Sequence, residues 1–243
     1  MHFIYPDWPA PSNVRAAVTT RAGGVSVGSY STLNLGAHVG DDPDVVAENR
    51  RRVREALQMR TEPTWLNQVH GTHVIEARAG VAPPTADASV ARSPGAVCVV
   101  LTADCLPVLF CDEQGTRVAA AHAGWRGLVG GVLAATVTAL ESPPRSLLAW
   151  LGPAIEQSAF EVGDEVREQF VLRHSENAGA FSPNARGRWQ ADLYALARLE
   201  LAHLGVTRVY GGDFACFADA EHFFSYRRES RTGRMGTFVW LEH

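Results

Sequence analysis

The chain has 243 residues, of which 46% are hydrophobic and 20% are charged, and its formal net charge is −4. This composition is that of an ordinary globular protein that can bury a core without disulfides or a structural metal, and it lacks the basic surface that a nucleic-acid partner requires. All 22 basic residues are arginine, which excludes a lysine Schiff base and a P-loop lysine.

The amino-terminal stretch MHFIYPDWPAP lacks the charged start and apolar centre of a signal peptide. No run of about 18 apolar residues is present, so no membrane contact through a spanning helix is expected. We therefore expect a cytoplasmic protein whose cysteines are free thiols. The final Leu-Glu-His resembles the stump of a purification tag, and no function is assigned to it. The cysteines are Cys98, Cys105, Cys111 and Cys216.

The first half of the chain is expected to alternate strands, loops and one long helix. In chain order, the pattern predicts a strand at 14–21, a loop rich in Gly and Ser at 23–36, a helix at 41–59, a strand at 72–78 and a surface connector at 82–95. Asp42 is a suitable N-cap for the helix, and Pro43 suits its first position.

The second half continues this alternation. The pattern predicts strands at 96–105, 107–112 and 116–124, a helix at 125–140, a strand at 147–155, helices at 163–174 and 190–205, and strands at 208–216, 223–228 and 235–241. The strand at 96–105 is apolar on both faces, which predicts a central, covered strand. Because no linker divides the chain, we expect one α/β domain of mixed α+β character over residues 1–243, with mixed sheets covered by helices.

Three short stretches end or interrupt an apolar strand with a reactive side chain: NQVHGTHV (67–74), TADC (102–105) and AHAGWRG (121–127). Such strand ends are where α/β proteins bind ligands. Together they offer His70, Cys105 and His122. One thiolate and two neutral imidazoles suit zinc and leave a fourth position for water or substrate. In this interpretation Asp104 or another carboxylate orients a ligating histidine.

The spacing of these residues leaves another interpretation open. His70 and Cys105 are 35 residues apart, and Cys105 and His122 are 17 apart, unlike the close pairs of a zinc knuckle. On spacing alone, the favoured interpretation is that Cys105 is a small buried hydrophobic residue, the commonest role of a free cysteine, with His70 and His122 hydrogen-bonded to the backbone.

Four arginines stand beside Gly-rich or aromatic segments, where a guanidinium group can hold a phosphate or a carboxylate. The alternative for each is a solvated residue at a strand end. We favour the alternative for any one of them, but not for all four together. They are Arg21, Arg126, Arg227 and Arg228.

Several motifs occur in a fixed order: NQVHG, TADCLPV, HAGWRG, LGPAI followed by FEVGDEV, and FFSYRR followed by TGRM. In these motifs the chain resembles the YfiH family, also labelled polyphenol oxidase, laccase-domain-containing or FAMIN-like. The resemblance covers about residues 12 to 240. It implies a compact α/β fold of a family-specific type and a zinc site formed by His70, Cys105 and His122, with copper in the older labelling.

The resemblance also implies an activity. It implies phosphorolysis of adenosine, inosine and guanosine with phosphate as co-substrate, together with adenosine deaminase and S-methyl-5′-thioadenosine phosphorylase activities in the same pocket. The segments RAGGVS and LNLG match the family's substrate loop, and Arg21, Asn34 and Arg227 are carried over as nucleoside or phosphate contacts.

The sequence lacks patterns that two rival functions, copper oxidation and deamination by a known type of zinc site, would require. A blue-copper site usually adds a weak axial methionine to Cys and two His, and a multicopper cluster uses His-x-His pairs, which this sequence lacks. The H-x-E…P-C-x-x-C pattern of known zinc nucleobase deaminases is also absent. The sequence therefore disfavours, as the native reaction, a copper-dependent polyphenol oxidase (laccase), which stays an alternative from the family label. Two further alternatives are a cysteine hydrolase with Cys105 as nucleophile and a histidine base, and a non-enzymatic module that binds a nucleoside or a metal.

Overall fold

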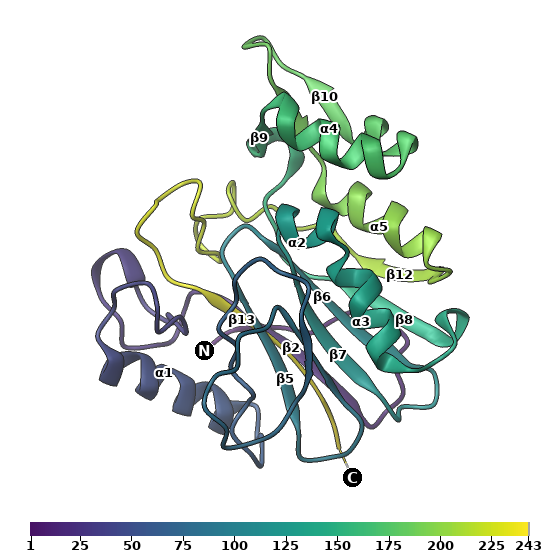
Figure 1. Cartoon of the computed structure of the whole chain (residues 1–243). Coiled ribbons are helices and arrows are strands. Elements are labelled where there is room, and N and C mark those ends of the chain that lie inside the picture. Colours follow the sequence, from purple (N-terminus) through teal and green to yellow (C-terminus); the bar gives the residue numbers. More distant parts are fainter. Residues whose placement is uncertain (243) are drawn as a thin grey trace.

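The computed structural model describes residues 1–242, in which two β-sheets pack face to face and carry helices on their outer sides (Figure 1). The larger sheet has the strand order β12 (Arg208–Gly211), β8 (Leu147–Leu151), β6 (Leu106–Asp112), β7 (Val118–Ala123), β4 (Ala88–Ala91) and β3 (Val74–Glu76). The smaller sheet has the order β1 (Phe3–Ile4), β2 (Val14–Thr19), β13 (Met235–Leu241) and β5 (Val97–Thr102). The predicted α/β class is confirmed.

Helices cover the outer face of each sheet. Against the six-stranded sheet lie α2 (Trp125–Gly130), α3 (Val132–Leu140) and α5 (Leu193–His203), with α4 (Asp164–Arg173) beyond them (Figure 1). Against the four-stranded sheet lies α1 (Pro43–Ala56). A small third sheet of β10 (Phe181–Pro183), β11 (Trp189–Ala191) and β9 (Glu161–Val162) adjoins α4. Short 3-10 turns are η1 (Gly28–Tyr30), η2 (Pro144–Ser146), η3 (Gln157–Ala159) and η4 (Ser175–Ala180).

Strand alternation explains this layering. Successive side chains of a strand point to opposite faces. In β6, Val108 and Phe110 pack in the core under the helices, whereas Leu109 and Cys111 pack between the two sheets. Since both faces of β6 are covered, the strand has the continuous apolar sequence expected of a buried strand. No helix within residues 1–242 is long and apolar enough to cross a membrane.

Most predicted elements are present, and α1 begins as the sequence indicates. Asp42 is its N-cap and accepts a hydrogen bond from Asp44 N at 2.9 Å, and Pro43 is the first helical residue. The strand at 96–105 is covered as predicted, although β5 lies at the edge of its sheet rather than at its centre. At the carboxyl end Leu241 is a buried residue of β13 and Glu242 pairs with Arg15, while His243 lies outside the described residues.

Some predicted elements need correction, the first three of them in the second half of the chain. The helix at 125–140 is broken at Gly131, whose φ of 99° lies in the left-handed region. The helix at 190–205 begins only at Leu193, because Trp189–Ala191 pair in β11 and Asp192 caps the helix through Ala195 N. The segment 223–228 forms turns instead of a strand.

The predicted connector at 82–95 contains β4, whose four residues are all buried. The sequence Ala-Ser-Val-Ala is too small and too polar to stand out as a strand, yet small side chains suit a strand covered by α3. This correction concerns function, because β4 follows directly after Asp87.

Candidate active site and metal centre

Cys105 lies where the chain passes from one sheet to the other. The strand β5 ends at Thr102 in the four-stranded sheet, and β6 begins at Leu106 in the six-stranded sheet. Asp104 makes the crossing possible with a φ of 90°, a left-handed conformation that Asp tolerates better than most residues. The acid and the thiol inside an apolar run thus mark a sharp turn between two buried strands.

The neighbouring strand places His122 beside Cys105. In the β6–β7 pair His122 is opposite Pro107, two residues beyond Cys105. The His122 ring is almost fully buried, with 3% of the residue exposed. Its Nδ1 lies 2.8 Å from Asp87 Oδ1, so Nε2 remains free for another partner.

His70 completes the cluster from the loop before β3. Its φ of 59° is left-handed and turns the side chain toward Cys105, whose Sγ lies 3.8 Å from His70 Nε2. The His70 and His122 rings meet edge to face at 4.8 Å between centroids. One ligand atom from each of His70, Cys105 and His122 lies within 4.8 Å of the others.

Asp87 holds two of these candidate ligands in place and was missed by the sequence analysis. Its fully buried carboxylate accepts backbone hydrogen bonds from Val69, His70 and Gly71 at 3.2, 2.9 and 2.6 Å, besides its contact with His122. One carboxylate therefore fixes both the His70 loop and the His122 ring. The available signal was an acidic residue inside the small, apolar stretch ADASVA.

The proposed orienting role of Asp104 is corrected by this finding. Asp104 Oδ2 accepts a hydrogen bond from Arg227 N at 2.6 Å, and Oδ1 is buried without a partner among the described residues. Burial raises the pKa of this carboxyl group, and the hydrogen bonds from Ser225 and Arg227 offset this only in part. Asp104 thus holds the Arg227 segment, while Asp87 orients the histidine.

The cluster favours charge separation between the thiol and the buried imidazole. Burial would raise the pKa of Cys105, but the positive charge of His122 and hydrogen bonds from His122 and His70 outweigh it and lower the pKa to about 6. Burial would lower the pKa of His122, but the Cys105 thiolate and Asp87 raise it to about 9. A thiolate is the form of cysteine that binds metals and attacks electrophiles.

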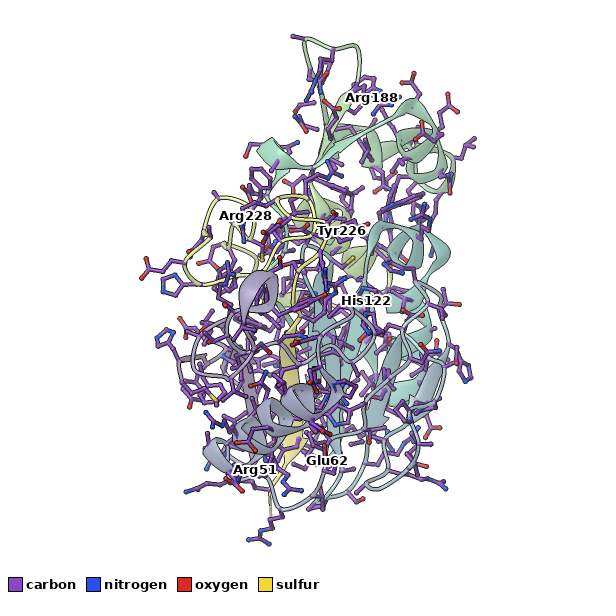
Figure 2. All side chains as sticks on the ribbon, turned by 90° about the vertical axis from the view of Figure 1, so that its left-hand side faces the viewer. Arg51, Glu62, His122, Arg188, Tyr226 and Arg228 are labelled. Atoms are coloured by element: carbon purple, nitrogen blue, oxygen red, sulfur yellow. The ribbon has the colours of Figure 1, made fainter. Side chains whose placement is uncertain are left out.

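The cluster forms part of the wall of a cavity of about 460 Å³. Figure 2 shows His122 and Tyr226, two of its lining residues, close together in the middle of the molecule. The wall combines a cationic part with an apolar part. The first includes Arg126, Arg227 and Arg234, and the second Ile155, Phe160 and Tyr226.

The three arginines of the cavity have no carboxylate partner among residues 1–242. Arg227 donates from Nη1 to the carbonyl oxygens of Ala159 and Glu161 and lies over the Phe160 ring at 5.5 Å. Arg234 donates from Nη1 to two backbone carbonyl oxygens, and burial lowers its pKa. Each guanidinium group keeps donors free for an anion.

Two predicted substrate contacts lie elsewhere. Arg21 donates to the carbonyl oxygens of Ser31 and Ala220 and lies over the Phe224 ring, and Asn34 is fully buried with hydrogen bonds to Gly36 and Asp41. Neither residue lines the cavity. Arg21 connects Ser31 to Ala220, and Asn34 Oδ1 accepts a hydrogen bond from Arg234 N at 2.9 Å, so both residues hold the 220–236 segment against the 24–36 loop. Of the three predicted contacts, Arg227 alone lines the cavity.

Relatives of this chain are known by sequence and by structure. The family model described as multi-copper polyphenol oxidoreductase laccase matches residues 15–242. A Pseudomonas aeruginosa protein named purine nucleoside phosphorylase is 58% identical over 241 residues, covering 99% of this chain and 98% of its own. The Escherichia coli protein named purine nucleoside phosphorylase YfiH is 52% identical over 239 residues, covering 98% of each chain.

Solved structures show the same fold. The Neisseria meningitidis protein NMB0706 matches with a TM-score of 0.97 at 51% identity, covering 100% of both chains. YlmD from Geobacillus stearothermophilus matches with a TM-score of 0.95 at 29% identity, covering 100% of this chain and 97% of its own.

Proposed function

Because the chain belongs to the YfiH family, we propose that it is a zinc-dependent purine nucleoside phosphorylase acting on adenosine, inosine and guanosine. The observation that carries the proposal is the position of the Cys105, His70 and His122 cluster in the wall of an arginine-lined cavity. A phosphorylase must hold an anion and an uncharged nucleoside side by side, and this cavity offers a cationic part and an aromatic part. The names of these relatives point to the same reaction.

The donor set fits zinc. Ligands of a single tetrahedral zinc lie about 3.3 to 3.6 Å apart, and Cys105 Sγ and His70 Nε2 are already 3.8 Å apart. His122 would bind through Nε2, since Asp87 holds its Nδ1, an arrangement common for ligating histidines. When bound, zinc supplies a Lewis acid at this centre.

The arginines suit phosphate. Arg126, Arg227 and Arg234 bring three positive charges to one cavity, and guanidinium groups bind phosphate oxygens in pairs. In this scheme they hold hydrogen phosphate with one oxygen toward C1′ of the ribose. That oxygen bonds to C1′ as the bond from C1′ to purine N9 breaks, and the proton of hydrogen phosphate ends on the purine.

The aromatic part suits the purine. Phe160 and Tyr226 offer aromatic contacts to a base, and Ile155 adds an apolar contact. Arg227 lies over one face of Phe160 and Arg234 over one face of Tyr226, so a base would stack on the opposite faces. Gln68, which also lines the cavity, exchanges hydrogen bonds with Leu101 N and O and is therefore occupied by the protein itself. The same cavity would accept S-methyl-5′-thioadenosine, and deamination of adenosine would be a second reaction of the same centre.

The decisive experiment follows inosine and phosphate with the purified protein. Hypoxanthine and ribose 1-phosphate are measured over time, and zinc content is measured on the same batch. We expect equal amounts of both products, no hypoxanthine without phosphate, and a rate that follows zinc occupancy. The Cys105→Ala variant is expected to lose both zinc and activity. No turnover of inosine, adenosine or guanosine at full zinc occupancy would reject the proposal.

A cysteine hydrolase is the second candidate, and the lowered pKa of Cys105 favours it. Cys105 would attack the substrate, with His70 or His122 as its base. This candidate predicts turnover that survives chelation and is lost on alkylation of the thiol. The phosphorylase predicts loss of turnover on chelation and its return with zinc.

Copper oxidation of phenols is disfavoured by the ligands present. A blue-copper centre needs a weak axial ligand, usually methionine. Met59 and Met235 are packed in apolar clusters, and Met235 Sδ accepts a hydrogen bond from Phe224 N. No methionine lines the cavity within the described residues.

A further inference from the structure

A second group of potential metal ligands lies in the helical layer, away from the Cys105 cavity. It comprises His174, which follows α4, with Glu200 and His203 on the last turns of α5. Glu200 and His203 are three residues apart and therefore share one face of the helix. Figure 1 shows α4 and α5 as neighbouring helices, and none of these residues lines the Cys105 cavity.

The two imidazole rings of the group lie face to face. The His174 and His203 rings stack at 4.0 Å between centroids with an interplanar angle of 14°. One ligand atom from each of His174, Glu200 and His203 lies within 4.8 Å of the others. Glu176, in η4, adds a carboxylate whose Oε1 lies 2.6 Å from His203 Nε2.

The charges of this cluster favour a cation. Glu176 and Glu200 carry two negative charges, and Arg173, which is 2.6 Å from Glu200, carries one positive charge, so the group is formally at −1 with neutral imidazoles. The His174 ring makes no hydrogen bond within residues 1–242, and its Nε2 is 3.8 Å from Glu200 Oε2. A nitrogen ligand therefore faces a carboxylate across a gap that an ion can bridge.

We propose that His174, Glu200 and His203 form a second site for a divalent transition metal, with Glu176 as an additional ligand. Two imidazoles and carboxylate oxygen are ligands that zinc accepts, whereas magnesium and calcium prefer oxygen alone. Two donors on one zinc lie at most about 4.2 Å apart, so the side chains must close in on the ion. The stacked rings must also turn, because a metal lies in the plane of each imidazole that binds it, and Glu200 Oε2 must share the ion with Arg173 Nε, which lies 3.3 Å away. The two His side chains can make these movements because they are 31% and 33% exposed.

The site would join α4 to α5 and reach toward the active site. Arg173, which pairs with Glu200, also donates from Nη1 to the carbonyl oxygen of Val129 in α2. The first turn of α2 carries Trp125 and Arg126, both of which line the cavity. A metal at the second site would therefore be connected, through Arg173 and α2, to the wall of the active-site cavity.

The test counts zinc per chain after dialysis of the metal-free protein at buffered micromolar free zinc. We expect two ions in the wild type and one in His203→Ala. Glu176→Gln is a second variant in case His203→Ala fails to fold. It is expected to keep the fold and to weaken zinc binding at the second site at least tenfold. The matched control is His222→Ala, which removes a histidine paired with a single carboxylate, Asp219, and should keep two ions. The same number of zinc ions in the wild type and in His203→Ala would overturn the proposal.

Cobalt distinguishes the two sites by their ligands. Cobalt at the Cys105 site is expected to give a thiolate charge-transfer band, and cobalt at the His174 site is expected to give none. In the Cys105→Ala variant, zinc should still raise the Tm, and the further change His203→Ala should abolish this rise. A Tm that does not respond to zinc in Cys105→Ala would contradict the second site without bearing on the first.

Discussion

Gly124, at the end of β7, leaves the space in which the three candidate ligands meet. A Cβ at this position would lie 2.9 Å from Cys105 Sγ and 3.0 Å from His70 Cδ2. Its backbone is extended, with φ of −60° and ψ of 156°, so an alanine would cause no backbone strain. The glycine is therefore required for room and not for conformation.

Gly124→Ala should lower kcat/KM for inosine at least tenfold and weaken zinc binding, because Cys105 and His70 must move apart. The stability of the fold should change little. Steady-state kinetics and zinc titration measure the two effects. Gly179→Ala is the matched control, since a Cβ there meets nothing within 4 Å, and it should be neutral. If Gly124→Ala were as active as Gly179→Ala, the close approach of Cys105 and His70 would not be needed for activity.

Asp87→Asn should weaken zinc binding by roughly 10- to 100-fold, the usual effect of losing a carboxylate that orients a ligating histidine. The amide keeps one acceptor oxygen but turns its NH₂ group toward the backbone donors of Val69 and Gly71 or toward His122. Competition with a calibrated chelator measures the affinity. Unchanged affinity would mean that Asp87 serves the fold alone.

Cys105 should be the only cysteine alkylated in the folded, zinc-free protein. Burial raises the pKa of Cys98 and of Cys111 to about 12 and that of Cys216 well above its ordinary value, whereas the pKa of Cys105 is about 6. The thiolate is the reactive form, so labelling by iodoacetamide should be fast at neutral pH and slow as the pH falls through about 6. Mass spectrometry locates the label. Zinc should protect Cys105, and labelling of Cys98 first would contradict this account.

At the scale of elements, the sequence indicates helices better than short strands. α1 carries its own signals, an N-cap and a proline at the first position, and these act within a few residues. The strand β4 carries none, because Ala88–Ala91 gain their burial from β3 and β7 on either side and from α3 and β5 above and below. The break at Gly131 likewise depends on a single φ value inside an otherwise helical pattern.

The candidate site shows the same difference between local signals, which the sequence reveals, and contacts between distant segments, which it does not. His70, Cys105 and His122 could be named from the motifs that resemble the family, although their spacing alone favoured a buried thiol over a metal site. Asp87 could not be named, because its partners are the backbone of residues 69–71 and a ring from another strand. Arg21 and Asn34 stand in matching motifs, yet their contacts are with other loops of the protein.

The N-cap of α1 gives a test at this scale that should leave the site untouched. Asp42→Ala removes the side chain that accepts from Asp44 N, which should cost about 1 kcal/mol of unfolding free energy. Urea denaturation measures the loss. Since Asp42 does not line the cavity, kcat and KM should remain those of the wild type. Asp42→Asn is the control, because asparagine caps about as well as aspartate.

At the scale of the whole molecule, the six-stranded sheet belongs to two cores at once. One face packs under the helices and the other packs against the four-stranded sheet, and the two faces share the same backbone. The chain also crosses between the sheets at Cys105, so neither sheet is a separate stretch of sequence. We therefore expect residues 1–243 to behave as one domain that unfolds in a single cooperative transition.

Two neighbouring substitutions test this expectation from opposite faces of β6. Phe110→Ala opens a cavity under the helices and should cost about 3–5 kcal/mol, while Leu109→Ala opens one between the sheets and should cost about 2–5 kcal/mol. If the molecule is one domain, each variant shifts the urea midpoint of tryptophan fluorescence and of far-ultraviolet circular dichroism by the same amount. The fluorescence is the sum over six tryptophans, of which Trp150 is buried between the sheets, and the circular dichroism is dominated by the helices. A Leu109→Ala protein whose fluorescence changes at a lower urea concentration than its helical signal would show that the two cores unfold separately.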